Sequence, residues 1–180
     1  MPQIKFSELP EDLRVQLTES GREELWHRVD EFGGIKAVSD AFDFSRSRMY
    51  NWKNKDLALP VGFVKRIMGE NSTDEVKLLK GGGSTGAIRS PEFPLQVSEE
   101  ILTRIKSSVV LNSEQTPTYI TSERVLADRF VELLEKFGNV EHTVYSRLSR
   151  FEVRYPKFLN ELLSDLEFEQ DLPARIDEQG

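Results

Sequence analysis

The stretch from Val38 to Lys55 constrains the fold of this chain more than any other. Apolar residues recur there at helical spacing on both sides of a short Asp-Phe-Ser break, which predicts two short helices joined by a tight turn. The side chains expected to be buried between these helices are Val38, Ala41, Phe42, Phe44, Met49 and Trp52. Such a set of contacts would hold the two helices at a fixed angle.

The second of these helices is expected to present a polar and cationic face. Ser45 is a natural N-cap for it, and the helix should run to about Asn54. Its exposed residues are predicted to be Arg46, Ser47, Arg48, Asn51, Lys53 and Asn54. A helix-turn-helix requires this combination, because its first helix packs while its second enters the major groove of DNA.

The distribution of charge supports this interpretation better than the net charge does. The chain carries a formal charge of -7, which by itself argues against nucleic acid. The segment from Phe44 to Arg66, however, holds six Lys or Arg residues and a single acid, Asp56. A basic segment in an acidic chain favours sequence-specific binding over indiscriminate coating of DNA. Simple solubility, or adaptation to a salty cytoplasm, would also explain the acidic remainder. A regulator of this kind would be archaeal-like or phage-like in origin.

Length and composition narrow the class of protein. A chain of 180 residues can form one domain or two small ones. It lacks any run of about 20 apolar residues that would span a membrane, and its N-terminus has no secretory signal pattern. Without cysteine it has neither disulfides nor a thiolate metal site. These features favour a cytoplasmic protein that is not membrane-bound.

The N-terminal region is expected to be an all-α domain over residues 1–70. Apolar periodicity and helix-stop signals predict helices over residues 11–17, 22–32, 35–42, 45–54 and 60–69. Residues 71–96 follow as a predicted linker, because the sequence from Lys77 to Pro94 is rich in glycine, serine and proline.

Residues 97–167 are expected to form a second domain with the element order α-β-β-α-β-β-α. Ser98 and Ser122 are predicted helix caps, and strands are expected over residues 108–112, 116–121, 140–146 and 150–155. The two hairpins would form one antiparallel sheet with helices on one face, and residues 168–180 would be an acidic tail. The predicted fold class is therefore α+β.

The segment from Ile35 to Asn54, with the helix after Pro60, resembles the helix-turn-helix domains of the Cro and lambda-repressor family. The resemblance implies that Ser45-Arg46-Ser47 starts the recognition helix and that Arg48 is among its DNA-binding residues. It also implies that base edges face Arg46, Ser47, Tyr50, Asn51 and Asn54, and that phosphates face Lys53 and Lys55. Asp43 stands where that family often has glycine, and Asp tolerates the left-handed conformation of such a turn. A helical hairpin used only for packing or for protein contact is the alternative.

Residues 97–167 resemble half of a LAGLIDADG homing endonuclease in element order, and residues 119–138 and 150–155 in sequence pattern. That family ends its first helix with a carboxylate that binds the catalytic metal. Lys106 and Ser108 stand there in this chain, and neither replaces a metal-binding carboxylate. Glu99 and Glu100 lie about two turns too early. The resemblance therefore implies a domain without nuclease activity, whose saddle-shaped sheet binds DNA or whose first helix pairs with a second copy. Certain bacterial sporulation regulators join similar parts in the reverse order.

The sequence offers few other candidates for chemistry. His27 and His142 are far apart, and the loop from Lys80 to Gly86 lacks the Gly-Lys-Ser/Thr ending of a phosphate loop. No metal or cofactor is predicted. Three arginines cluster near one predicted hairpin: Arg147, Arg150 and Arg154. They would form either a second nucleic-acid surface or cross-strand ion pairs with Glu141 and Glu152.

Three functions remain open from the sequence. The first is a sequence-specific DNA-binding transcriptional regulator, not an enzyme, that acts as a homodimer on double-stranded DNA half-sites about one helical turn apart. The second is an active homing-type endonuclease with a displaced metal site. The third is a protein-interaction or ligand-sensing module.

Overall fold

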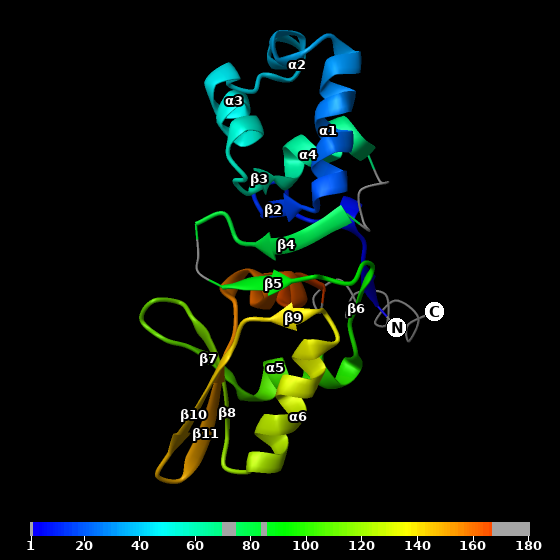
Figure 1. Ribbon diagram of the computed structural model, residues 1–180. Coiled ribbons are helices and arrows are strands. Elements are labelled where there is room, and N and C mark those ends of the chain that lie inside the picture. Colours follow the sequence, from blue (N-terminus) through cyan, green and yellow to red (C-terminus); the bar gives the residue numbers. More distant parts are fainter. Residues whose placement is uncertain (1, 70–74, 84–85, 167–180) are drawn as a thin grey trace, which may run out of the picture.

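The computed structural model describes residues 2–69, 75–83 and 86–166 (Figure 1). The protein is a mixed α/β structure with antiparallel sheets. A group of short helices occupies one end of the molecule, a five-stranded sheet crosses its middle, and a four-stranded sheet with two helices forms the other end. Among the described residues, no helix is long and apolar enough to cross a membrane.

Four α-helices form the N-terminal group. They are α1 (Glu19–Phe32), α2 (Ile35–Phe42), α3 (Arg46–Asn54) and α4 (Val61–Met68). The helices expected over residues 22–32, 35–42, 45–54 and 60–69 are thereby confirmed. The side chains of Trp26, Phe44 and Trp52 surround Phe63, with ring centroids 5.0 to 5.9 Å from that ring. This aromatic cluster ties α1, α3 and α4 together.

The N-terminal region is not all-α. The helix expected over residues 11–17 is wrong, because Arg14–Leu17 form strand β2 and Leu59–Pro60 form strand β3 beside it. Val15 and Leu17 are buried while Arg14 and Gln16 are half-buried, which is the period of two of a strand. The segment is too short for this alternation to be distinguished from one helical turn by sequence pattern.

The five-stranded sheet joins the two halves of the chain. Its strand order is β3-β2-β4-β5-β9, and every pairing is antiparallel. The strands β4 (Val76–Lys80) and β5 (Ala87–Arg89) lie at its centre, and β9 (Asn139–Val140) comes from the C-terminal half. The predicted linker over residues 71–96 is therefore wrong for residues 76–80 and 87–89; residues 71–74 and 84–85 lie outside the described part of the chain.

Glycines that suggested a linker serve close packing instead. A Cβ atom on Gly82 would lie 2.6 Å from the carbonyl oxygen of Asp12, which is closer than real Cβ contacts allow. Gly86 has φ of +96°, and a Cβ there would lie 3.0 Å from the ring of Pro156. The β4–β5 connection therefore needs glycine to fit between the N-terminal strands and the last helix.

A two-stranded sheet completes the N-terminal half. Strand β1 (Gln3–Ile4) pairs with β6 (Leu95–Gln96), and the 3-10 turn η1 (Phe6–Glu8) follows β1. The ring of Phe6 is fully buried and meets Phe93 edge-on at 5.6 Å. The start of the chain is thus packed beside residues 93–96, which were also assigned to the linker.

The C-terminal half has the expected order of elements, with the short strand β9 added between α6 and β10. It contains α5 (Glu99–Ser108), β7 (Val109–Leu111), β8 (Pro117–Thr121), α6 (Arg124–Glu135), β10 (Thr143–Arg147) and β11 (Arg150–Arg154), then a helix over residues 157–166. The sheet order is β10-β11-β8-β7. Ser98 caps α5 as predicted, whereas Glu123, not Ser122, occupies the N-cap position of α6.

The predicted strand over residues 140–146 is divided between two sheets. Val140 pairs with Ile88 of the five-stranded sheet, and β10 begins only at Thr143.

Buried side chains from Ile4 to Leu163 form one continuous apolar cluster through both halves. The helical group and the four-stranded sheet are therefore parts of one packed structure. The predicted tail over residues 168–180 lies outside the described residues.

Replacing Leu79 by alanine should destabilise the whole protein. Leu79 is fully buried in β4, and removing a buried leucine side chain costs about 2–5 kcal/mol of unfolding free energy. Urea denaturation followed by circular dichroism measures this change. Lys80→Ala, at the next and exposed position, is the matched control and should cost less than about 0.5 kcal/mol. Equal stability of the two variants would contradict a central role for β4.

Candidate nucleic-acid interface

The turn between α2 and α3 is fixed by local hydrogen bonds. Asp43 has φ of 59° and ψ of 34°, so it adopts the left-handed conformation expected of it. The hydroxyl of Ser39 donates to the carbonyl oxygen of Phe44 at 2.6 Å. The Oγ of Ser45 accepts the backbone N–H of Arg48 at 3.4 Å and caps α3, as predicted. These contacts set where α3 begins.

The inner face of α3 is largely as predicted. Met49 and Trp52 are buried, and Val38 of α2 is buried in the same core cluster. Phe42 and Phe44 are only partly buried, and Ala41 is exposed, contrary to expectation. Ile35 and Val38 take the inward positions of α2, so Ala41 lies toward its outer side.

The outer face of α3 carries the polar residues predicted to contact DNA. Tyr50 stands in the middle of this face with 52% of its surface exposed. The guanidinium of Arg46 lies 3.5 Å from the Asp40 carboxylate on α2. All nine predicted residues are exposed: Ser45, Arg46, Ser47, Arg48, Tyr50, Asn51, Lys53, Asn54 and Lys55.

Arg22 of α1 anchors the other end of α3, which the sequence did not indicate. Its Nη2 donates to the carbonyl oxygens of Lys53 at 3.0 Å and Trp52 at 3.4 Å. A cation at a helix C-terminus also interacts favourably with the helix dipole. The same side chain lies 3.6 Å from Asp56, whose carboxylate is also 3.6 Å from Lys77 of β4. The C-terminal end of α3 is thereby tied to α1 and to the five-stranded sheet.

The three arginines of the predicted second surface lie on the β10–β11 hairpin, on the side of the sheet away from α5 and α6. Arg147 Nε lies 2.5 Å and Arg150 Nη2 lies 3.2 Å from the two oxygens of Glu152. Arg154 lies over the ring of Tyr145 at 4.5 Å. The ion pairing with Glu152 that the sequence left open is present, while Glu141 pairs with Arg89 at 3.6 Å. One carboxylate shared by two guanidinium groups still leaves an excess of positive charge.

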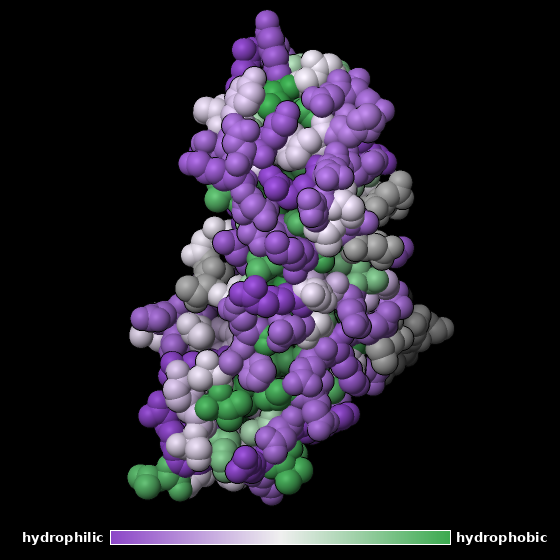
Figure 2. All heavy atoms as spheres, viewed as in Figure 1, coloured by the Kyte–Doolittle hydropathy of each residue, from purple (hydrophilic) through white to green (hydrophobic). Residues whose placement is uncertain are grey.

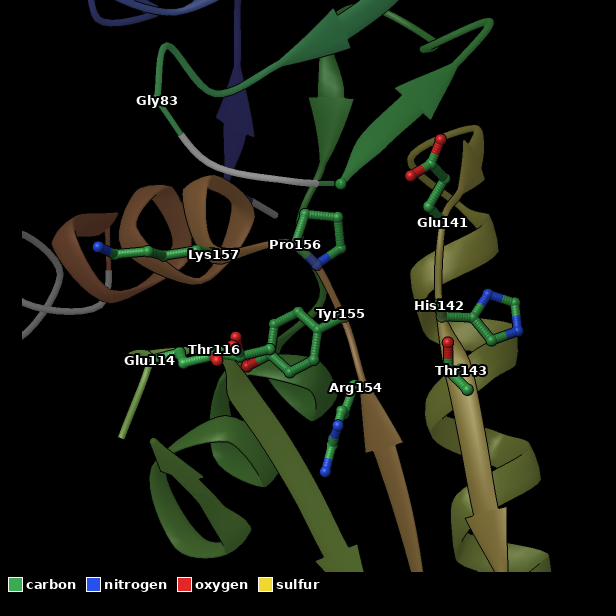
Figure 3. A pocket seen from close by; sticks show the side chains of 11 residues that line it. Gly83, Glu114, Thr116, Glu141, His142, Thr143, Arg154, Tyr155, Pro156 and Lys157 are labelled. Carbon is green, nitrogen blue, oxygen red and sulfur yellow. The ribbon is translucent and has the colours of Figure 1, made fainter. Parts of the chain in front are cut away.

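An open cavity of about 770 Å³ lies where β11 leaves the four-stranded sheet (Figure 3). Its charged lining is mixed and includes Arg154 and Lys157 as well as Glu114 and Glu141. Figure 3 shows that Arg154, Lys157 and His142 point in three different directions. Because these groups do not converge, the cavity does not define a catalytic site.

The two histidines remain apart in the folded protein. His142 makes a hydrogen bond of 2.9 Å through Nδ1 with the carbonyl oxygen of Val140, and His27 lies 3.1 Å from Glu31 on α1. Within the described residues, no three His, Asp or Glu side chains lie close enough to hold a metal ion.

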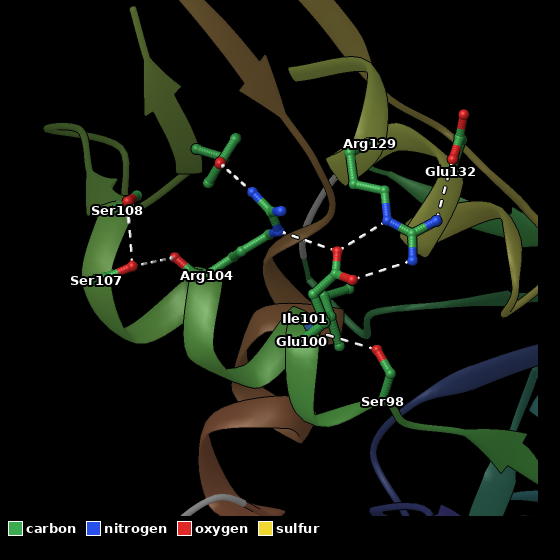
Figure 4. A network of polar contacts seen from close by, with 9 residues as sticks. Ser98, Glu100, Ile101, Arg104, Ser107, Ser108, Arg129 and Glu132 are labelled. Atoms are coloured by element: carbon green, nitrogen blue, oxygen red, sulfur yellow. Dashed lines mark hydrogen bonds and ion pairs between the residues drawn. The ribbon is translucent and has the colours of Figure 1, made fainter. Parts of the chain in front are cut away.

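Glu100 of α5, about two turns before the expected metal position, is held by arginines (Figure 4). Arg129 of α6 binds both of its oxygens, at 2.8 and 3.0 Å, and Arg104 donates to it at 3.2 Å. Arg104 also donates to the Tyr119 hydroxyl at 3.0 Å. Hydrogen bonding from Arg129 holds the pKa of the Glu100 carboxyl below its usual range. The group therefore joins α5 to α6 and to β8.

Comparison of the chain with protein-family models, with curated proteins and with solved structures gives no significant match. The two family resemblances described from the sequence therefore stay predictions. The geometry of α3 and of the β10–β11 hairpin carries the functional argument instead.

Glu100 should make the stability of the protein depend on pH. A carboxyl whose pKa is lowered by folding stabilises the native state above its unfolded pKa of about 4.3, and this contribution disappears as the pH falls through the folded pKa. The unfolding free energies of the wild type and of Glu100→Gln should therefore differ at pH 7 and converge in acid. Urea denaturation at a series of pH values measures this. The unfolding free energy of Glu99→Gln, a change in the same turn, should stay closer to that of the wild type at pH 7. If the difference in unfolding free energy between the wild type and Glu100→Gln instead widened in acid, the stabilising role given to the Glu100 carboxylate would be contradicted.

Proposed function

We propose that this protein binds double-stranded DNA in a sequence-specific manner and regulates transcription, with α3 reading the major groove. The observation that carries the proposal is the construction of α3 itself. Two buried side chains, Met49 and Trp52, fix its inner face, while nine polar or cationic residues over 45–55 are exposed. A helix positioned in this way by a preceding helix and a tight turn is the reading element of helix-turn-helix proteins.

The exposed side chains match the chemistry of DNA. Arginine pairs with the O6 and N7 atoms of guanine and asparagine with the N6 and N7 atoms of adenine, so Arg46 and Asn51 are the principal candidates for base recognition. Ser47, Tyr50 and Asn54 add contacts to base edges. Lys53, Lys55 and Arg48 provide the positive charge for phosphates, and Ser45 presents the first turn of the helix to the backbone.

One short helix makes too few base contacts for tight binding, so the proposal needs a second source of affinity. A homodimer on half-sites about one helical turn apart would double the contacts. A second DNA-binding surface in the same chain would have the same effect, and the arginines at 147, 150 and 154 supply the charge for one. Light scattering of the protein with and without DNA separates these two arrangements.

Selection from random duplex DNA, followed by sequencing, tests the proposal. At about 150 mM salt the wild type should enrich one motif, since the affinity then depends on base contacts as well as phosphates. Arg46→Ala/Asn51→Ala should abolish the enrichment, because each lost bidentate contact costs about 1–3 kcal/mol of discrimination.

Lys136→Ala is the matched control, because it removes one exposed positive charge at the end of α6. It should leave the enriched motif unchanged. If the wild type enriches no motif, or if the α3 variant enriches the same one, the regulator proposal is wrong. A protein-interaction or ligand-sensing module would then be the better account.

A further inference from the structure

The β10–β11 hairpin is a projecting ribbon with an apolar tip. Five residue pairs form its ladder, from Thr143 opposite Arg154 to Arg147 opposite Arg150, and only Leu148 and Ser149 make the turn. It projects at the end of the molecule far from α3 (Figure 1). The relative exposure of Leu148 is 109%, so no neighbouring residue covers its side chain. Figure 2 shows hydrophobic surface at this tip.

The residues around the tip carry positive charge in a fixed arrangement. Arg147 and Arg150 flank the two turn residues, and the buried Glu152 carboxylate binds one N–H group of each at 2.5 and 3.2 Å. About half of each arginine side chain remains exposed to solvent. Each guanidinium has five N–H donors, so donors remain for a ligand after the ion pair is made. The carboxylate thus holds two guanidinium groups beside the leucine without cancelling their charge.

An exposed leucine between two arginines on a narrow ribbon suits one kind of partner. Leucine and other apolar side chains act as wedges that enter the minor groove, separate two base pairs and kink the duplex. Arginines bind the phosphates on either side of such a wedge, because a guanidinium group matches the geometry of a phosphate. A protein partner with an apolar pocket would cover Leu148, but it would not by itself need both flanking cations.

We propose that the β10–β11 hairpin inserts Leu148 into the minor groove of the duplex that α3 reads, with Arg147 and Arg150 on the phosphates beside it. This inference rests on the proposed function of α3. The ribbon then supplies the second source of affinity within one chain, and the DNA is bent at the point of insertion.

The five-stranded sheet makes simultaneous contact at two places possible. Strand β3 leads directly into α4 of the helical group, and two residues separate the end of β9 from the start of β10. Both strands belong to the same hydrogen-bonded sheet, so α3 and the hairpin are held in a fixed relation. In the view of Figure 1 both lie toward the left of the molecule. One chain would therefore cover an asymmetric site, with the motif read by α3 at one end and an easily kinked pyrimidine–purine step at the other.

The test compares Leu148→Ala with Val125→Ala on the duplex enriched by the wild type. Val125 is also an exposed aliphatic residue, at the start of α6 and outside the hairpin. Binding is measured by fluorescence anisotropy, bending by the mobility of circularly permuted fragments, and contact by hydroxyl-radical footprinting. Thermal unfolding checks that both variants are folded, which is expected because Leu148 and Val125 are both exposed, at 109% and 76%.

We expect Leu148→Ala to enrich the same motif as the wild type, to bind roughly tenfold more weakly, and to lose the bend and the protection at one end of the footprint. Arg147→Ala/Arg150→Ala should in addition lower the slope of log affinity against log salt by about two. Val125→Ala should match the wild type in every measurement.

Three results would overturn the inference. Unchanged binding and bending by Leu148→Ala would show that the tip does not touch DNA, while leaving the function of α3 intact. A loss of self-association caused by Leu148→Ala, with unchanged bending, would assign the tip to a second copy of the chain. Failure of the wild type to enrich any duplex would remove the proposed function and this inference together.

Discussion

The antiparallel pairing of β2 with β4 is the interaction on which the rest of the structure depends. Strand β2 leads into α1. Strand β4 pairs with β5, and β5 pairs with β9 of the C-terminal half. The β2–β4 pair therefore connects the helical group to the C-terminal half. Val15 and Leu79 are partners in this ladder, and both are fully buried. Without this pairing, the chain would be two small units on a glycine-rich tether, each with little apolar surface to bury.

The position of α3 follows from the same framework. The Ser45 cap defines its beginning and Arg22 binds the carbonyl groups at its end, while Asp56 and Lys77 connect that end to β4. A recognition helix must hold its side chains in register with the base pairs, and rigid elements do this better than loops. The proposed reading of DNA by α3 and the proposed insertion of Leu148 both depend on this rigidity, because two contacts on one duplex need a fixed separation.

The sequence predicted most of the helices, though not the strand at residues 14–17, because helix signals are local. Helical periodicity, the caps at Ser45 and Ser98, and the left-handed Asp43 are all properties of neighbouring residues, and each is found in the structure. The strands of the central sheet were missed because β2 pairs with β4, and β5 with β9, across large sequence separations, while a glycine-rich turn joins β4 to β5. Their connecting glycines resemble a linker in composition, and only packing against Asp12 and Pro156 reveals their purpose. The Arg22 anchor has no local signature at all. All nine residues predicted to be exposed on α3 and its ends are exposed. For the hairpin, the sequence left open whether the arginines form ion pairs or a second nucleic-acid surface, and the structure shows Glu152 paired with two of them.

The central claim is that α3 reads the major groove, and methylation interference on the selected duplex tests it most directly. Methyl groups at guanine N7 lie in the major groove and those at adenine N3 lie in the minor groove. The account predicts that N7 methylation within the selected motif blocks binding and that Arg46→Ala relieves the block at one of these guanines. Binding that is insensitive to N7 methylation throughout the motif, or blocked only by N3 methylation, would contradict it.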